Sequence, residues 1–275
     1  MNPTRLTVDT EPENYSYWSP DGKRLVYQWD LDGSGVYVIN ADGTGQKRLS
    51  PSPGFDTTPS WSPNATKIVY VHLLQPPRPN QPPPMTDIRV MNADGTDDHA
   101  ILASKLFSVE PRWSVNNNIM FMSLMNGGGF EIYVMNVDGT ALRRLTNGAN
   151  NGDPVWSPDG AKISFGSDRE GGGKLNIFAM DADGGNVVQV THFDVPYEAG
   201  DTNWSCDGKK ITFGRDVNGM KQSDPEAYAE VWTMNADGRE AAATMVQYSA
   251  LGCAPRWRPS GDAEPDVITA GRLRW

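Results

Sequence analysis

Short stretches of alternating hydrophobic and polar residues recur along the chain, separated by Gly, Asp and Pro. Within the third quarter of the sequence, four such stretches rich in β-branched and aromatic residues occupy 153–157, 162–166, 175–180 and 187–191. Alternation of this kind predicts β-strands, and the residues between the stretches predict tight turns. This part of the chain is therefore expected to fold as one four-stranded antiparallel sheet.

Two phrases repeat in register throughout the chain. The phrase Trp-Ser-Pro-Asp-Gly at 18–22 returns unchanged at 156–160, and altered forms begin at Trp61, Trp113, Trp204 and Trp257. A second phrase, written NADG in its commonest form, ends at Gly43, Gly95, Gly139, Gly184 and Gly238. The six tryptophans are 43 to 53 residues apart. A period of this length with several short strands per unit is typical of the blades of a β-propeller.

The repeats predict an all-β, six-bladed propeller of four-stranded antiparallel blades that occupies residues 1–275 as a single domain. Residues 4–8 match the fourth-strand phrases at 47–50 and 143–146, yet they precede the first blade. The sixth unit has enough chain for only three strands. We therefore expect residues 4–8 to complete blade six, because closure removes an open sheet edge. The predicted blades begin near residues 14, 57, 109, 152, 200 and 253.

The repeated phrases resemble those of TolB-like propellers over about residues 4 to 275. The resemblance concerns the propeller only, because the chain has no room for the N-terminal α/β domain of TolB. It implies a periplasmic or secreted protein, whereas the absence of a signal-peptide pattern at the N-terminus leaves a cytoplasmic location open. Similar propellers serve as protein-binding modules, as domains of peptidases and as platforms of polysaccharide lyases. The resemblance therefore implies a fold and leaves the activity open.

The chain is acidic, with a formal net charge of −10. Acidity disfavours nucleic acid as a partner, because a phosphate backbone requires a basic surface. No apolar run approaches the roughly 20 residues of a membrane span, and we expect a monomer. Much of the negative charge comes from Asp-Gly pairs, which predict turn chemistry rather than ligand binding. These aspartates are Asp21, Asp42, Asp94, Asp138, Asp159, Asp183, Asp207 and Asp237.

In a propeller of this strand order, the loops that enter each innermost strand and those that join the second and third strands share one face, here called the mouth face. Loops on a rigid scaffold commonly carry binding residues. The position three residues before each tryptophan places carboxylates there in three successive blades, at Glu110, Asp153 and Asp201. Such carboxylates suit a divalent cation such as Ca²⁺, a basic partner group or acid–base chemistry. Alternatively, they pair with Arg112, Arg215 and Arg256, which the same register brings nearby.

Other candidates on the mouth face are two histidines, two aromatic residues and two insertions. His72 and His192 are candidate acid–base residues, and Tyr15 and Trp29 are candidate aromatic contacts. The insertions at 73–86, which is proline-rich, and at 217–229 are longer than a blade connection requires. The chain contains no linear motif for a nucleophile, a phosphate-binding loop or a zinc site.

Two functions remain open from the sequence. The first is a non-catalytic module that binds a protein or peptide through the mouth face, and the missing catalytic motif favours it. The second is a lyase or hydrolase acting on a saccharide, with His72 or His192 as base, a divalent metal at Glu110, Asp153 and Asp201, and arginine holding substrate charge. The predicted ligand-binding residues are Tyr15, Trp29, Glu110, Arg112, Asp153, Asp201, Arg215 and Arg256.

Overall fold

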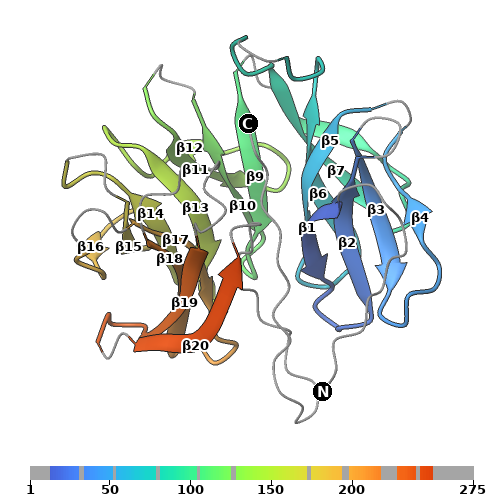
Figure 1. Ribbon diagram of the computed structural model, residues 1–275. Helices are drawn as coiled ribbons and strands as arrows, with labels where there is room; N and C mark the ends of the chain where they lie inside the picture. The colour runs from blue at the N-terminus through green and yellow to red at the C-terminus, as the bar shows by residue number, and fades with distance from the viewer. Residues whose placement is uncertain are drawn as a thin grey trace. The chain divides into compact units, whose positions relative to one another are not determined.

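The computed structural model describes residues 13–30, 34–51, 54–78, 81–103, 106–124, 128–171, 175–193, 198–217, 228–239 and 242–249. The regular structure in these ranges consists of strands arranged in five four-stranded antiparallel sheets (Figure 1). Within each sheet the strands follow the order of the chain. The predicted all-β fold of four-stranded antiparallel blades is confirmed.

Each blade is named by its place in the chain. Blade one contains β1 (Glu13–Trp18), β2 (Arg24–Trp29), β3 (Gly35–Asn40) and β4 (Lys47–Arg48). Blade two contains β5 (Asp56–Trp61), β6 (Lys67–Leu73), β7 (Thr86–Asn92) and β8 (His99–Ala103). Blade three contains β9 (Ser108–Trp113), β10 (Asn118–Ser123), β11 (Glu131–Asn136) and β12 (Arg143–Arg144). Blade four contains β13 (Asn151–Trp156), β14 (Lys162–Ser167), β15 (Asn176–Asp181) and β16 (Val188–Gln189). Blade five contains β17 (Glu198–Trp204), β18 (Lys210–Val217), β19 (Tyr228–Asn235) and β20 (Ala242–Ser249).

The predicted sixth blade and its closing strand at 4–8 lie outside the described residues. The chain divides into two compact units, Met1–Trp113 and Ser114–Trp275. In every blade, the first strand begins at the same end of the sheet as the second strand ends, and this end is called the mouth end. Within the described residues, the structure contains no helix with the length and hydrophobicity that membrane crossing requires.

Two of the repeated tryptophans, Trp61 and Trp204, pack between neighbouring blades, as predicted. Trp61 is 5% exposed and shares a hydrophobic cluster with Val26 and Val38 of blade one. Its Nε1 donates a hydrogen bond to the carbonyl of Tyr17 at 3.1 Å. Trp204 repeats this arrangement with the carbonyl of Val155 at 3.3 Å. Burial of each indole contributes about 2–3 kcal/mol, so these wedges are a main source of cohesion between blades.

A second repeated contact joins the second and third strands inside each blade. Facing aromatic rings stabilise such a strand pair because they pack at the same register position. In blade two, an arginine replaces one ring, and Nε of Arg89 donates to the hydroxyl of Tyr70 at 3.2 Å. In the other blades, the ring centroids are 5.9 Å apart for Tyr27–Tyr37, 5.6 Å for Phe121–Tyr133, 5.9 Å for Phe165–Phe178 and 6.3 Å for Phe213–Trp232.

The Asp-Gly turns have the predicted chemistry. In the first phrase, Ser19 Oγ donates to Asp21 Oδ1 at 2.6 Å, and Gly22 follows with a φ of 67°. In the second phrase, the backbone nitrogen and the hydroxyl of Thr44 both donate to Asp42. All eight turn aspartates accept at least one hydrogen bond from their own turn. These side-chain hydrogen bonds lower the pKa of seven of them: Asp21, Asp42, Asp94, Asp138, Asp159, Asp207 and Asp237.

Candidate functional site

The innermost strand of each described blade contains a left-handed residue three positions before its tryptophan. In blades one, two, four and five, the pairing register between the first two strands is interrupted there, which marks a β-bulge. A bulge redirects the side chain at its centre, and a non-glycine residue in this region carries backbone strain. The φ values are 50° for Tyr15, 49° for Thr58, 53° for Glu110, 49° for Asp153 and 52° for Asp201.

In the first unit, Glu110 pairs with Arg112 two residues along β9. Arg112 Nη2 lies 3.3 Å from Glu110 Oε2, and the two side chains are 12% and 14% exposed. The guanidinium of Arg112 also lies 4.4 Å from the ring centre of Tyr17. The structure thus brings Glu110 and Arg112 together in the way that the alternative interpretation of these carboxylates predicts.

The two predicted aromatic contacts of blade one are buried in the structure. Tyr15 is 6% exposed and Trp29 is 8% exposed. The ring of Trp29 lies edge-on to Tyr37 with a centroid separation of 4.9 Å. A ligand-binding role for Tyr15 and Trp29 stays a prediction.

In the second unit, Asp153 on β13 lies beside β17, the strand that carries Asp201. A Cβ atom added to Gly200 would lie 3.8 Å from Asp153 Oδ2. Arg215 Nη1 lies 3.7 Å from Glu230 Oε2, and the guanidinium of Arg215 stacks over the rings of Phe193 and Trp232. Within the described ranges, no group of three or more His, Cys, Asp or Glu residues is arranged to hold a metal ion. The ligand-binding and cation-binding roles of these residues stay predictions, and Arg256 lies outside the described residues.

The two candidate histidines have different surroundings. His192 is exposed, whereas His72 Nδ1 lies 2.7 Å from Oδ1 of Asp56, which faces it across β5 and β6. Asp56 is 1% exposed, and the side chain of His72 is 34% exposed. The hydrogen bond to Asp56 raises the pKa of His72, although partial burial of the imidazole opposes this effect. A buried carboxylate that orients a partly exposed imidazole is an arrangement suited to proton transfer.

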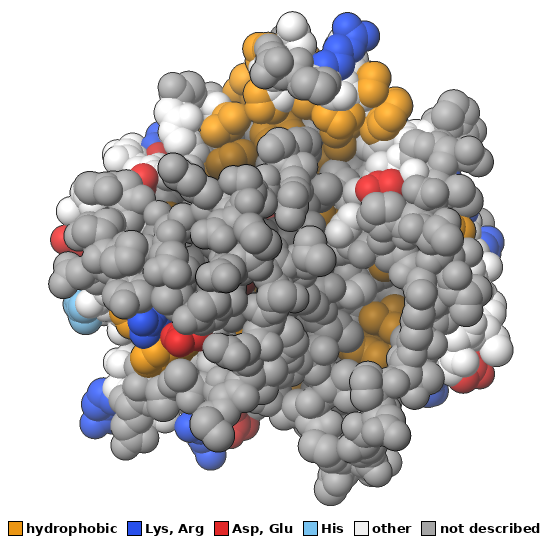
Figure 2. Space-filling model, viewed as in Figure 1, with side chains coloured by type: hydrophobic (Ala, Val, Ile, Leu, Met, Phe, Trp, Pro, Cys, Tyr) orange, Lys and Arg blue, Asp and Glu red, His pale blue; other side chains and the backbone are white. Residues whose placement is uncertain are grey.

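Exposed hydrophobic side chains gather at the mouth end of blade two, here called the apolar mouth cluster. Leu74, Met85 and Leu106 are 47%, 53% and 39% exposed. Backbone hydrogen bonds hold these three residues near one another. Leu74 N donates to Met85 O at 2.9 Å, and N of the next residue, Thr86, donates to Leu106 O at 3.2 Å. Figure 2 shows hydrophobic side chains gathered at the top of the view, where Figure 1 shows the teal segment between β6 and β7. The proline-rich insertion thus supplies most of an exposed apolar surface.

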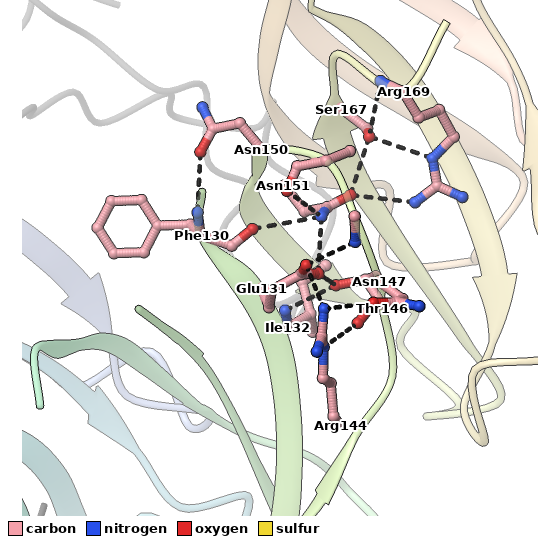
Figure 3. A network of polar contacts seen from close by, with 12 residues as sticks. Phe130, Glu131, Ile132, Arg144, Thr146, Asn147, Asn150, Asn151, Ser167 and Arg169 are labelled. Atoms are coloured by element: carbon pink, nitrogen blue, oxygen red, sulfur yellow. Dashed lines mark hydrogen bonds and ion pairs between the residues drawn. The ribbon is translucent and has the colours of Figure 1, made fainter. Parts of the chain in front are cut away.

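A buried carboxylate organises the mouth end of blades three and four (Figure 3). Glu131, at the start of β11, is 4% exposed. It accepts hydrogen bonds from Arg144 Nη2 at 2.5 Å, from Thr146 Oγ1 at 2.6 Å and from Asn151 Nδ2 at 3.0 Å. The backbone nitrogen of Gly148 donates a fourth, at 2.8 Å. These bonds compensate the cost of burying the carboxylate, which is the condition for a stable buried charge.

Asn151 connects this carboxylate to a second arginine, Arg169, which follows β14. Asn151 Oδ1 accepts from Ser167 Oγ at 2.8 Å and from Arg169 Nη2 at 3.0 Å. The guanidinium of Arg169 lies 5.1 Å from the ring centre of Phe165 and 4.7 Å from that of Phe178. Arg169 is not recognisable as a candidate from the sequence, because it belongs to no repeat and to no motif. Its only signal in the sequence is its position directly after a predicted second strand, in a mouth-face loop.

The comparisons with known proteins agree with this architecture. A family model described as the TolB beta propeller domain matches residues 85–262, which is more than half of the chain. The Tol-Pal system protein TolB of Rhizorhabdus wittichii is 42% identical over 60 residues, which are 22% of this chain and 14% of that protein. The protein TolB homolog of Chlorobium luteolum is 29% identical over 162 residues, which are 58% of this chain and 34% of that protein. The chain thus spans about a third or less of the length of these curated relatives.

Among solved structures, that of a TolB from Agrobacterium tumefaciens, described as putative, is similar with a TM-score of 0.73. The identity is 21%, and the match covers 89% of this chain and 84% of the other. This likeness concerns the fold alone. Because the family model matches most of the chain, the chain belongs to the TolB beta propeller domain family.

Proposed function

We propose that the chain is a non-catalytic binding module that engages a protein or peptide through its mouth-face loops. The observation that carries this proposal is the apolar mouth cluster of Leu74, Met85 and Leu106. It contains three of the seven large hydrophobic side chains that are exposed among the described residues. Contiguous exposed hydrophobic groups are unfavourable in water, and soluble proteins retain them chiefly where a partner covers them.

The bulges of the innermost strands support the same proposal. Their backbone conformation is nearly constant from blade to blade, whereas the side chain at the bulge is Tyr, Thr, Glu, Asp or Asp. A constant backbone with variable side chains is how a repeat scaffold presents an individual binding surface. Under this proposal, Asp153 and Asp201 are ligand contacts on the second unit.

We further propose that residues 1–275 form one six-bladed domain, with a sixth blade near residues 253–275 completed by residues 4–8. In blade two, a face carrying Trp61, Ile68 and Tyr70 packs on blade one. The equivalent face of blade one carries Trp18, Leu25 and Tyr27, and it also forms a buried hydrophobic cluster. A sixth blade is the element that the repeat requires against this face. Closure of this kind leaves no free sheet edge, which favours a monomer.

The binding proposal is tested by charge substitution in the apolar mouth cluster. A Leu74→Asp/Met85→Asp variant should bind the protein partner with an affinity at least about 10-fold lower than that of the wild type. The reason is that a charge cannot enter an apolar interface without a large desolvation cost. The matched control is Val187→Asp/Val188→Asp, which alters two exposed hydrophobic residues at the outer edge of blade four. Affinity capture followed by titration of the purified partner measures the difference. Equal affinity of both variants and the wild type would contradict the proposal.

A second candidate function, acid–base catalysis on a saccharide by a lyase or hydrolase, is favoured by the pairing of His72 with Asp56. Partial exposure of the imidazole leaves it accessible to a substrate, while Asp56 holds its orientation. The test is turnover of neutral and acidic oligosaccharides by the wild type, His72→Gln and His192→Gln. Activity that only His72→Gln abolishes would establish this candidate.

Titration with Ca²⁺ of the wild type and an Asp153→Asn/Asp201→Asn variant examines the predicted cation site.

A further inference from the structure

We infer that Arg169, held by Ser167 and Asn151, binds a carboxylate group of the ligand. The inference rests on the proposed function, because it names one chemical group that the bound protein or peptide presents. All three residues belong to blade four in the second unit, and Arg169 follows β14 at the mouth end. Arg169 thus lies at the mouth end of blade four, and Figure 3 shows it beside Ser167 and Asn151.

The charges around Glu131 do not balance within the network. Two arginines, Arg144 and Arg169, connect to a single buried carboxylate. Arg144 forms a direct ion pair with that carboxylate, and its Nη2 lies 2.5 Å from Glu131 Oε1. Arg169 instead donates to neutral acceptors, Ser167 Oγ at 3.1 Å and Asn151 Oδ1 at 3.0 Å. Across the described part of the chain, Arg169 forms no ion pair, so its positive charge remains uncompensated.

Partial burial makes this charge unfavourable in the absence of a ligand. The desolvation of Arg169 lowers its pKa, and the more distant carboxylates of Glu131 and Glu170 oppose that effect only in part. A cation in such a position gains more from an added anion than an exposed arginine does, because less water screens the interaction. The next residue, Glu170, is exposed and does not form an ion pair with Arg169.

The guanidinium of Arg169 is also fixed in orientation before any ligand arrives. The rings of Phe165 and Phe178 lie against it, and its Nε and Nη2 are bound to Ser167 and Asn151. Within the described residues, Nη1 donates no hydrogen bond, so its two donors are available. The two donors of this fixed nitrogen can bind the oxygens of a carboxylate, a planar group that the guanidinium geometry matches. We assign the carboxylate to an acidic or C-terminal residue of the bound peptide, and a uronic acid is the alternative that the test separates from it.

The inference is tested by direct titration of the full chain with small probes. The probes are the peptide Ac-Gly-Glu-Gly-NH₂, its glutamine counterpart, digalacturonate and inorganic phosphate, with the Arg169 Nε–Hε signal followed by NMR. The glutamyl peptide should bind saturably, and the uncharged glutamine peptide should bind at least about 10-fold more weakly. Arg169→Gln should weaken carboxylate binding by about 10-fold or more, and Arg169→Lys by less. The matched control is Arg143→Gln, which removes an equal charge from an exposed site on β12.

Each outcome decides the inference. Preference for the glutamyl peptide supports a peptide carboxylate as the ligand group, whereas preference for digalacturonate would overturn the assignment to a peptide and indicate a uronic acid instead. Absence of saturable binding, a preference for phosphate, or equal loss in Arg143→Gln would overturn it. If Arg169→Gln fails to fold, the shift of the Arg169 signal in the wild type and the affinity of Arg169→Lys provide the answer. If the protein captures its partner but does not bind the carboxylate probes, the inference about Arg169 is wrong and the proposed function stands. If it binds the carboxylate probes but captures no partner, the proposed function is wrong.

Discussion

Nδ1 of His72 lies 2.7 Å from Oδ1 of Asp56, in the same register position of adjacent strands. The carboxylate is almost fully buried, and its Oδ2 has no hydrogen-bond partner among the described residues. Asp87 faces His72 from β7, and its charge adds to the effect of Asp56, whereas Arg89 opposes it. Folding therefore places this imidazole where the protonated form is favoured.

This pairing predicts a stability that depends on pH. Because the pKa of His72 is raised in the folded state, its contribution is fully present below the ordinary histidine pKa of 6.5. The contribution is lost as the pH rises through the raised folded value. Urea unfolding of the wild type between about pH 5.5 and 8.5 should show this decline, and His72→Gln should lack it. The same pH dependence in both proteins would show that another group is responsible.

The turn aspartates predict the opposite behaviour in acid. Ser157 Oγ and Ala161 N donate to Asp159 at 2.6 and 3.0 Å, and these bonds lower its pKa. The stabilisation is thus present above the unfolded aspartate pKa and is lost as the pH falls through the folded value. Asp159→Ala should lower the urea midpoint at neutral pH, and its difference from the wild type should shrink as the pH falls below 3.8. Glu170→Gln, which alters an exposed carboxylate, serves as the control.

The indole of Trp61 predicts a large loss of stability on truncation. Trp61→Ala should cost about 3–5 kcal/mol of unfolding free energy, because it leaves a cavity between blades one and two. Trp61→Phe should cost less, although it removes the hydrogen bond from Nε1 to the carbonyl of Tyr17. Guanidinium denaturation measures both, with Val115→Ala as a control at an exposed hydrophobic residue. A cost below about 1 kcal/mol for Trp61→Ala would mean that the wedge is not essential to the core.

The sequence predicts those parts of the fold that local chemistry determines. The stretch predicted at 162–166 is observed as β14, Lys162–Ser167, because turn residues define strand ends within a few positions. The stacking of Arg112 on Tyr17 and the network of Arg169 depend on contacts between strands far apart in the sequence. No local pattern encodes which of those side chains meet. The left-handed bulges were also not predictable, since the residues there are not glycines.

The bulge at Asp153 predicts that stability and binding respond in opposite directions. A non-glycine residue at a φ of 49° is strained by about 1 kcal/mol, and Asp153→Gly should therefore raise the unfolding free energy by roughly that amount. If the carboxylate is retained for the ligand, the same variant should bind the partner more weakly, as functional sites commonly keep strain. Asp153→Val, which is β-branched, should destabilise the protein instead. Denaturation and partner titration on the same samples measure both effects. Stabilisation with unchanged affinity would assign Asp153 to the scaffold and not to the binding surface.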